Sequence, residues 1–149
     1  MTDAIKLEHP IVVTWQGDRR YSGGPPDSPA LTLDGNGTIA PSPVDAVLIA
    51  LGSCSAVDVV DILAKRRTPA TSLEVRLDFK RAAQPPRRLT AVHLSFRIAT
   101  ESARNHVERA VKLSFDKYCS VATSLAADLE VTWDVELTDV EGDANGAKS

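Results

Sequence analysis

The sequence is poor in cysteine, histidine and aromatic residues, and it has no surplus of positive charge. Its 149 residues include 2 Cys, 3 His and 5% aromatic residues, and the formal net charge is -3. An acidic balance gives no general attraction to phosphate backbones or anionic lipid, so we expect neither nucleic acid nor a membrane as partner. The cysteines and histidines lack the short spacings of zinc ligands, so we expect no metal and no cofactor.

The N-terminal residues show no basic stretch followed by an apolar one, and no unbroken apolar run approaches the roughly 20 residues of a membrane span. We therefore expect a cytoplasmic protein, a setting in which disulfides are more often transient and catalytic than permanent. With 43% hydrophobic and 25% charged residues, the composition is typical of one soluble globular domain over residues 1–149. The tail from about residue 140 is predicted to be disordered.

The two cysteines lie far apart in the sequence, and each has small neighbours. Cys54 lies within a long apolar segment, and Cys119 follows a second helical pattern. Small neighbours leave room for a substrate and a second thiol, which suggests a redox pair. The alternative is that both are buried and act as small hydrophobic residues, because a reactive cysteine needs surroundings that favour the thiolate.

The clearest secondary-structure signal is the start of a long helix. Ser42 is predicted as its N-cap, Pro43 as its first residue and Asp45 as the capping-box partner. Apolar residues then continue to Lys65, which gives a helix of about 24 residues and about 36 Å. Its first half is apolar on nearly every side, so a sheet and a partner subunit are both needed to cover it, and we predict a homodimer.

The remaining pattern predicts an α+β protein. Residues 11–15 and 31–33 are predicted strands, with loop residues 23–29 between them. Residues 73–80 and 89–98 alternate between apolar and polar side chains, which predicts a hairpin with one buried face. A helix is expected from residue 100 to 118, a short one over 120–127 and a last strand over 129–137.

Four segments together resemble the OsmC/Ohr family of peroxidases: residues 41–45, 50–60, 110–114 and 117–121. The resemblance extends over residues 15–137, and both cysteine contexts occur in the family's order. It implies an OsmC-like α+β fold, with an antiparallel sheet, a long central helix and two intertwined chains with the active sites near their interface. It also implies thiol-dependent reduction of organic hydroperoxides. By this resemblance Cys54 attacks the peroxide, and Cys119 then forms a disulfide with the oxidised Cys54. A cellular dithiol reduces the disulfide and restores both thiols.

The resemblance further implies an arginine near the thiolate, supplied by the early strand region. Arg19 and Arg20 are the candidates, and Arg20, which precedes Tyr21, is the better match; otherwise both are solvated hairpin charges. Many family members have Glu in the first turn of the long helix, where this chain has Asp45. Asp45 lies about 13.5 Å from Cys54 along a straight helix, so it can orient the arginine only across a dimer or through a long side chain, besides capping its own helix.

The ionisation of the thiols raises a separate question. Cys54 lies about three turns from the N-terminus of its helix, where the helix dipole has faded, so we expect an arginine to stabilise its thiolate. Asp58, one turn later, would raise the pKa of the Cys54 thiol unless its carboxylate pairs with a cation or points away into solvent. The amides around Ser120 and Val121 are predicted to ease the ionisation of Cys119.

Two other functions are compatible with the sequence. One is a non-catalytic dimer of the same fold that binds a small apolar ligand or a partner. The other is a thiol redox sensor, which would form its disulfide reversibly but turn over slowly. A Cys54 pKa at or above the ordinary value of about 8.5 would favour the binding protein.

Overall fold

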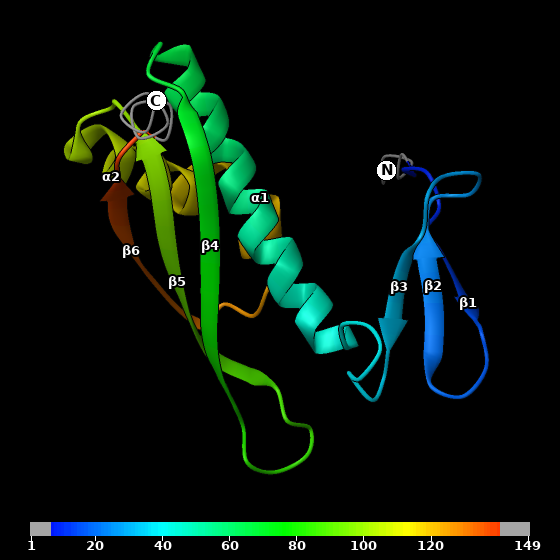
Figure 1. Ribbon diagram of the computed structural model, residues 1–149. Helices are drawn as coiled ribbons and strands as arrows, with labels where there is room; N and C mark the ends of the chain where they lie inside the picture. Colours follow the sequence, from blue (N-terminus) through cyan, green and yellow to red (C-terminus); the bar gives the residue numbers. More distant parts are fainter. Residues whose placement is uncertain (1–6, 141–149) are drawn as a thin grey trace, which may run out of the picture. The chain divides into compact units, whose positions relative to one another are not determined.

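The computed structural model describes residues 7–140, which fall into two compact units that divide after Val47. The first unit contains three strands and the first turn of the long helix; the second contains the rest of that helix, the other three strands and the shorter helices (Figure 1). The elements are β1 Val12–Trp15, β2 Arg20–Gly24, β3 Leu31–Asp34, α1 Pro43–Lys65, β4 Ala70–Arg81, β5 Leu89–Thr100, α2 Arg104–Leu113, the π-helical turn η1 Ser114–Tyr118, α3 Ser120–Ser124 and β6 Glu130–Thr138. The predicted disordered tail lies almost wholly outside the described residues.

The first unit is an antiparallel meander of β1, β2 and β3. Strand β2 was not predicted, because two of its five residues are glycine and it shows no apolar alternation. The hairpin before it turns at Gly17 and Asp18, whose φ angles of 97° and 51° suit a tight turn between twisted strands.

A buried carboxylate holds the loop that follows β3. Asp34 accepts hydrogen bonds from the amides of Asn36, Thr38 and Ile39 and from the Thr38 hydroxyl, at 2.9–3.1 Å. The Asn36 and Ile39 amides are the main reason that the pKa of this carboxyl lies well below its usual range. The loop is thus fixed just before α1 begins.

The start of α1 is confirmed as a capping box. The Asp45 amide donates to the Ser42 hydroxyl at 3.1 Å, and the Ser42 amide donates back to the Asp45 carboxylate at 3.0 Å. The helix ends at Lys65, as predicted from the apolar pattern.

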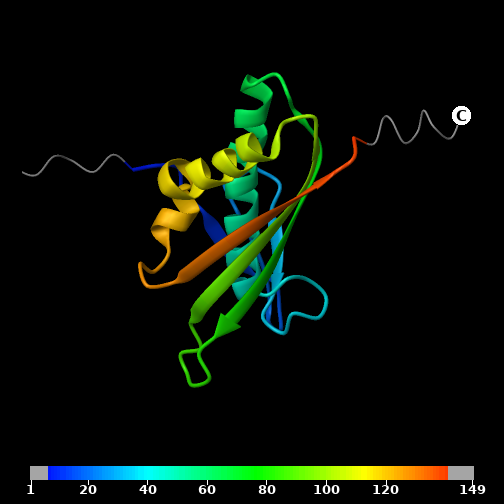
Figure 2. The same cartoon turned by 90° about the vertical axis from the view of Figure 1, so that its left-hand side faces the viewer.

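In the second unit, α1 and α2 lie on one face of a three-stranded sheet (Figures 1 and 2). The predicted hairpin is confirmed: β4 and β5 pair antiparallel, and β5 turns its apolar residues inward. The inward residues of β5 are almost completely buried: Val92, Leu94, Phe96 and Ile98. They form the core together with Leu51, Val59 and Leu63 of α1 and Val107 and Val111 of α2.

The expected α+β class is therefore confirmed, but the expectation of a purely antiparallel sheet is wrong for one pair of strands. Strand β6 pairs with β5 in parallel. The chain leaves β5, passes through α2, η1 and α3, and re-enters the sheet at the end where β5 began, which is the crossover that parallel neighbours require.

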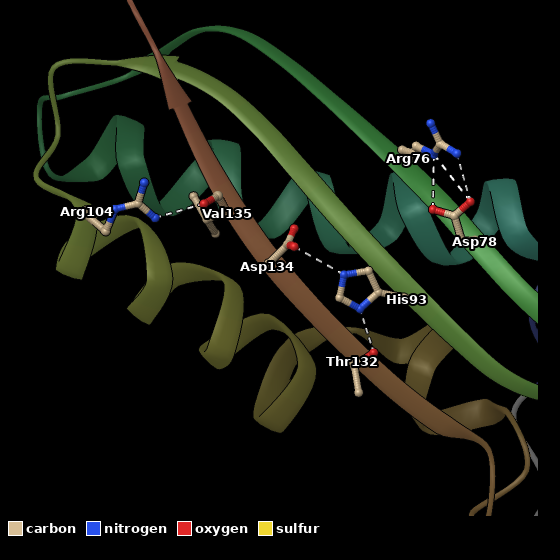
Figure 3. Close-up of polar contacts among 7 residues, drawn as sticks. All are labelled: Arg76, Asp78, His93, Arg104, Thr132, Asp134 and Val135. Atoms are coloured by element: carbon tan, nitrogen blue, oxygen red, sulfur yellow. Dashed lines mark hydrogen bonds and ion pairs between the residues drawn. The ribbon is translucent and has the colours of Figure 1, made fainter.

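The opposite face of this sheet is polar (Figure 3). His93 of β5 contacts Thr132 and Asp134 of β6, at 2.7 and 3.4 Å, and Arg76 pairs with Asp78 on β4 at 3.1 Å. These pairs are exposed, so each contributes little to stability, and they mark a solvated face.

Candidate functional site

Cys54 lies near the middle of α1, on a part of the helix that packs tightly against β4. A Cβ at Gly52 would come within 2.9 Å of Leu77, and Ser55 is fully buried with its hydroxyl bonded to the carbonyls of Leu51 and Gly52 at 3.0 Å. Gly52, one of the small neighbours that suggested room for a substrate, is thus small because the helix approaches β4 there. Cys54 itself is half-buried.

Cys119 lies at the joint between two helical segments. The π-helical turn η1 ends where the Cys119 amide donates to the Ser114 carbonyl at 2.7 Å, and the backbone of Cys119 is then extended. Its sulfur caps α3 by accepting from the Ala122 amide at 3.4 Å. The side chain is only 1% exposed, so its direct reaction with a bulky molecule is hindered.

The structure brings the two thiols together, although they are far apart in the sequence. The two thiols lie close enough for each to shift the pKa of the other, and the Cys54 sulfur lies 3.9 Å from the Ser120 hydroxyl. Both cysteines are free thiols. Adjacent free thiols on two separate helical elements are an arrangement that can form and break a disulfide.

The pKa of the Cys54 thiol is lowered. The main cause is the hydrogen bond from the Val121 amide, which outweighs the opposing effect of partial burial, and the Cys119 and Ser120 side chains and the Ser120 amide add to it. These donors come from the segment at the start of α3, so Cys54 does not depend on the distant N-terminus of its own helix.

The pKa of the Cys119 thiol is raised, chiefly by burial. The Ala122 amide lowers it in part, whereas the neighbouring Cys54 and the negative charge of Asp58 raise it further. Of the amides around Ser120 and Val121 that are expected to ease the ionisation of Cys119, the Ala122 amide does so, but burial outweighs it. The Ser120 and Val121 amides favour the Cys54 thiolate instead, because Cys119 is the capping residue and its sulfur meets the Ala122 amide.

Asp58 does not approach Cys54 as an unpaired charge. Its carboxylate accepts a hydrogen bond from the buried Ser114 hydroxyl at 2.8 Å. Since the Ser114 carbonyl also accepts the Cys119 amide, Asp58 is connected to the backbone of Cys119 through one residue. Within residues 7–140, Asp58 is therefore hydrogen-bonded to a hydroxyl and not paired with a cation, and its charge adds to the raised pKa of Cys119, after burial.

The other predicted site residues belong to the first unit. Arg19 is held there, because its guanidinium donates to the Gly35 carbonyl at 3.3 Å while the Gly35 amide donates to the Arg19 carbonyl at 2.8 Å. Arg20 is exposed on β2 opposite Asp34, and within residues 7–140 its guanidinium makes no ion pair. Asp45 is the capping residue of α1.

Sequence reasoning missed Ser114 and the amides that face Cys54. A serine on the buried side of a helix gives no signal of its own, although the Asp58 carboxylate predicted near the site called for a partner. Over residues 7–140, the structure contains no group of three His, Cys, Asp or Glu side chains placed to hold a metal ion.

The fold and site define an α+β protein in which two cysteine thiols, distant in sequence, lie next to each other between two helical elements. The model of the OsmC-like protein family matches residues 34–134, and the chain belongs to this family. It is 39% identical over 127 residues to the protein YhfA of Escherichia coli K12, a match that covers 84% of this chain and 95% of YhfA. YhfA of Shigella flexneri matches to the same extent.

Solved structures share the fold at lower identity. A hypothetical protein from Aquifex aeolicus VF5 matches with a TM-score of 0.76 and 24% identity, covering 90% of this chain and 100% of that one. The organic hydroperoxide resistance protein OhrB of Bacillus subtilis matches with a TM-score of 0.59 and 9% identity, covering 87% and 98%. An organic hydroperoxide resistance protein OsmC from Legionella pneumophila matches with a TM-score of 0.62 and 14% identity, covering 88% and 99%.

Helix α1 is long and apolar enough to span a membrane by length and composition alone, with a mean hydropathy of 2.0 over its most apolar window. The core helix of a soluble protein passes the same test. Here α1 contributes Leu51, Val59 and Leu63 to the core of a small soluble OsmC-like domain.

Proposed function

We propose that this protein is a cytoplasmic thiol-dependent peroxidase that reduces organic hydroperoxides. The observation that carries the proposal is the pair of adjacent free thiols with opposite pKa shifts: Cys54 is more acidic than an ordinary thiol, and Cys119 is less acidic. The family membership supports it, since structural relatives include proteins named for organic hydroperoxide resistance.

The opposite shifts support Cys54 as the attacking thiol and Cys119 as the resolving thiol. The Cys54 thiolate attacks the terminal oxygen of the hydroperoxide; the O–O bond breaks, the alkoxide leaves and takes up a proton, and Cys54 becomes a sulfenic acid. The Cys119 sulfur then attacks the Cys54 sulfur, water leaves, and the Cys54–Cys119 disulfide forms. Two electrons and two protons from a cellular dithiol restore both thiols.

The burial of the thiols suits this order. Cys54 is half-buried and can meet a peroxide, whereas Cys119 is almost fully buried and lies against Cys54. A protonated Cys119 also donates a hydrogen bond to the Cys54 thiolate, which holds the attacking sulfur ionised before the peroxide arrives.

Arg20 is our candidate for the cation beside the thiolate, and Asp45 is the carboxylate that orients it. Arg20 is preferred to Arg19 because the Arg19 guanidinium already binds the Gly35 carbonyl. Neither residue is required to explain the lowered pKa of Cys54, which the α3 amides account for. We therefore assign Arg20 to binding and polarising the peroxide as much as to holding the thiolate.

A homodimer is part of the proposal. The exposed apolar residues Ile49, Val57 and Val60 lie along one side of α1, and Val13, Trp15 and Leu31 are exposed in the first unit. Burial of such surface is favourable by about 25 cal/mol per Å². Light scattering is expected to give the mass of two chains at micromolar concentration, and a stable folded monomer would remove this part of the proposal.

The decisive experiment is stopped-flow oxidation of the reduced protein by an alkyl hydroperoxide and by hydrogen peroxide. The wild type should consume the alkyl hydroperoxide and form an internal disulfide, Cys54→Ser should consume none, and Cys119→Ser should react once. Mass spectrometry of Cys119→Ser after one equivalent should show one added oxygen on Cys54. A reaction too slow for turnover, with reversible disulfide formation, would favour the redox sensor; no reaction of Cys54 would favour the binding protein.

A further inference from the structure

A groove in the second unit, separate from the thiols, lies between α1 and α2 and has a volume of about 570 Å³. From α1 it is lined by Asp58, Asp61, Ile62 and Lys65; Asp61 and Ile62 follow Asp58 by three and four residues, and Lys65 follows them by four and three, so all four lie on one side of the helix. The groove is thus built on a continuous helical surface.

The second wall repeats this spacing on α2, where the lining residues are His106, Arg109, Ala110 and Leu113. Tyr118 of η1 completes the groove, and its side chain is half exposed. Both walls therefore belong to regular helices of the same compact unit, which keeps the groove's shape in place.

Two contacts between the helices fix the direction of the groove. Arg66, at the end of α1, donates from Nη2 to His106 Nε2 at 3.1 Å, near the start of α2. Asp58 meets Ser114 just after α2 ends. The groove therefore has an Arg66–His106 end and an Asp58–Ser114 end, about 12 Å apart along α1 at about 1.5 Å per residue.

The positive charges gather toward the Arg66–His106 end. Lys65, Arg66 and Arg109 line the groove, and within residues 7–140 none of the three makes an ion pair with a carboxylate. A guanidinium can only donate, so the His106 ring nitrogen accepts from Arg66 and orients its guanidinium.

The two carboxylates of the groove do not outnumber these charges. Asp58 lies at the opposite end, where it accepts from the Ser114 hydroxyl, and Asp58 and Asp61 together carry two negative charges against the three positive charges of Lys65, Arg66 and Arg109. Between the two ends, Ile62, Ala110 and Leu113 offer an apolar wall. A planar guanidinium that makes no ion pair is the side chain best suited to carboxylate and phosphate, because it donates two parallel hydrogen bonds.

We propose that this groove binds a small organic anion, whose carboxylate or phosphate is held by Arg66, Arg109 and Lys65 and whose apolar part lies along Ile62 and Leu113. The inference goes beyond the proposed peroxidase activity, because the groove does not include either sulfur and its ligand need not react. It would give the protein a second ligand site beside the helix that positions Cys119.

Calorimetric titration of the reduced full-length protein with octanoate and, separately, with inorganic phosphate tests the proposal. Saturable binding of octanoate that phosphate displaces is expected, with 1-octanol failing to bind, because the charge is needed to engage the guanidinium groups. If phosphate binds as well as octanoate, the ligand is a phosphate compound; if octanoate binds better, it is an amphiphilic carboxylate.

Arg66→Gln/Arg109→Gln is expected to weaken binding of the preferred probe at least about tenfold, since each lost bidentate pair costs more than a neutral hydrogen bond. Arg109→Gln alone keeps the Arg66–His106 contact and should weaken binding to a lesser extent, which guards against a fold defect in the double variant. The matched control is Arg97→Gln, on the polar face of the sheet, which should bind like the wild type.

Absence of saturable binding of both probes, equal binding of 1-octanol, or unchanged binding in the double variant would each overturn the proposal. Neither probe is a peroxide and binding is measured without turnover. A failure here is therefore distinct from a failure of the peroxidase, which the cysteine variants test.

Discussion

The Asp58 carboxylate lies 2.8 Å from the Ser114 hydroxyl, and this contact joins α1 to the turn that delivers Cys119. The same carboxylate adds to the raised pKa of the Cys119 thiol, after the larger effect of burial. Asp58 thus helps to keep Cys119 protonated while Cys54 is ionised. A difference in acidity between two adjacent thiols is what distinguishes the attacking from the resolving cysteine.

Asp58→Asn is expected to lower the pKa of the Cys119 thiol, because it removes a negative charge and keeps the shape of the side chain. Ultraviolet absorbance of the thiolate, measured against pH in a Cys54→Ser background, isolates Cys119. Asp61→Asn, one turn further along α1, is the matched control and should leave the titration in place. An unchanged Cys119 titration in Asp58→Asn would contradict this role.

Ser120→Ala tests the donors that favour the Cys54 thiolate. The Ser120 hydroxyl contributes to the lowered pKa, but the Val121 amide contributes most, so the pKa of Cys54 should rise by less than its full shift. The rate of the first oxidation should increase with pH as Cys54 loses its proton, with a midpoint below the pKa of an ordinary thiol in the wild type and closer to it in Ser120→Ala.

Stopped-flow rates across pH give both midpoints. Ser53→Ala is the matched control, because the Ser53 hydroxyl is also beside Cys54 but donates to the Ile49 carbonyl at 2.8 Å. If Ser120→Ala and Ser53→Ala have the same midpoint as the wild type, the Ser120 hydroxyl plays no part in the ionisation of Cys54.

The elements with strong local signals could be predicted from the sequence. The capping residues Ser42 and Asp45 fixed the start of α1, and the alternation on β4 and β5 fixed the hairpin, because each signal depends on residues that are close in the chain. Strand β2 was missed because its pairing with β1 and β3, and not its composition, makes it a strand. The parallel position of β6 depends on a crossover that no local pattern specifies.

The candidate site likewise has features that could be predicted from the sequence and features that could not. Both cysteines could be singled out from their contexts, but their surroundings depend on contacts between distant segments. The end of η1 and the start of α3, only a few residues apart, determine which backbone amides face Cys54. Helical periodicity placed Asp58 near Cys54 but could not show that Ser114 would meet its carboxylate.

Asp45→Ala should lower the free energy of unfolding by about 0.5–2 kcal/mol, because it removes one side of the capping box at the start of α1. Asp45→Glu keeps an acceptor for the Ser42 amide and should recover most of this loss. Urea denaturation measures both. If Asp45 also orients Arg20, Asp45→Ala will slow peroxide reduction more than a cap variant such as Ser42→Ala that is equally destabilised, whereas equal rates would leave Asp45 with a capping role alone.

Arg20 and Arg19 are neighbours in the sequence, but the structure predicts different consequences for their removal. Arg20→Ala removes an exposed guanidinium with no ion pair in the described part of the chain, so its stability should be unchanged. Its first oxidation should slow about tenfold or more, which corresponds to about 1.4 kcal/mol at the transition state. Arg20→Lys should recover only part of the rate, because an ammonium cannot make two parallel hydrogen bonds.

Arg19→Ala is the matched control for this prediction. It removes the hydrogen bond to the Gly35 carbonyl, so it should lower stability by roughly 0.5–1.5 kcal/mol while leaving the rate close to that of the wild type. Stopped-flow oxidation and urea denaturation of both variants separate the two roles. A slow Arg19→Ala with a normal Arg20→Ala would move the catalytic role to Arg19, and normal rates in both would leave the amides of the α3 segment as the sole activators of Cys54.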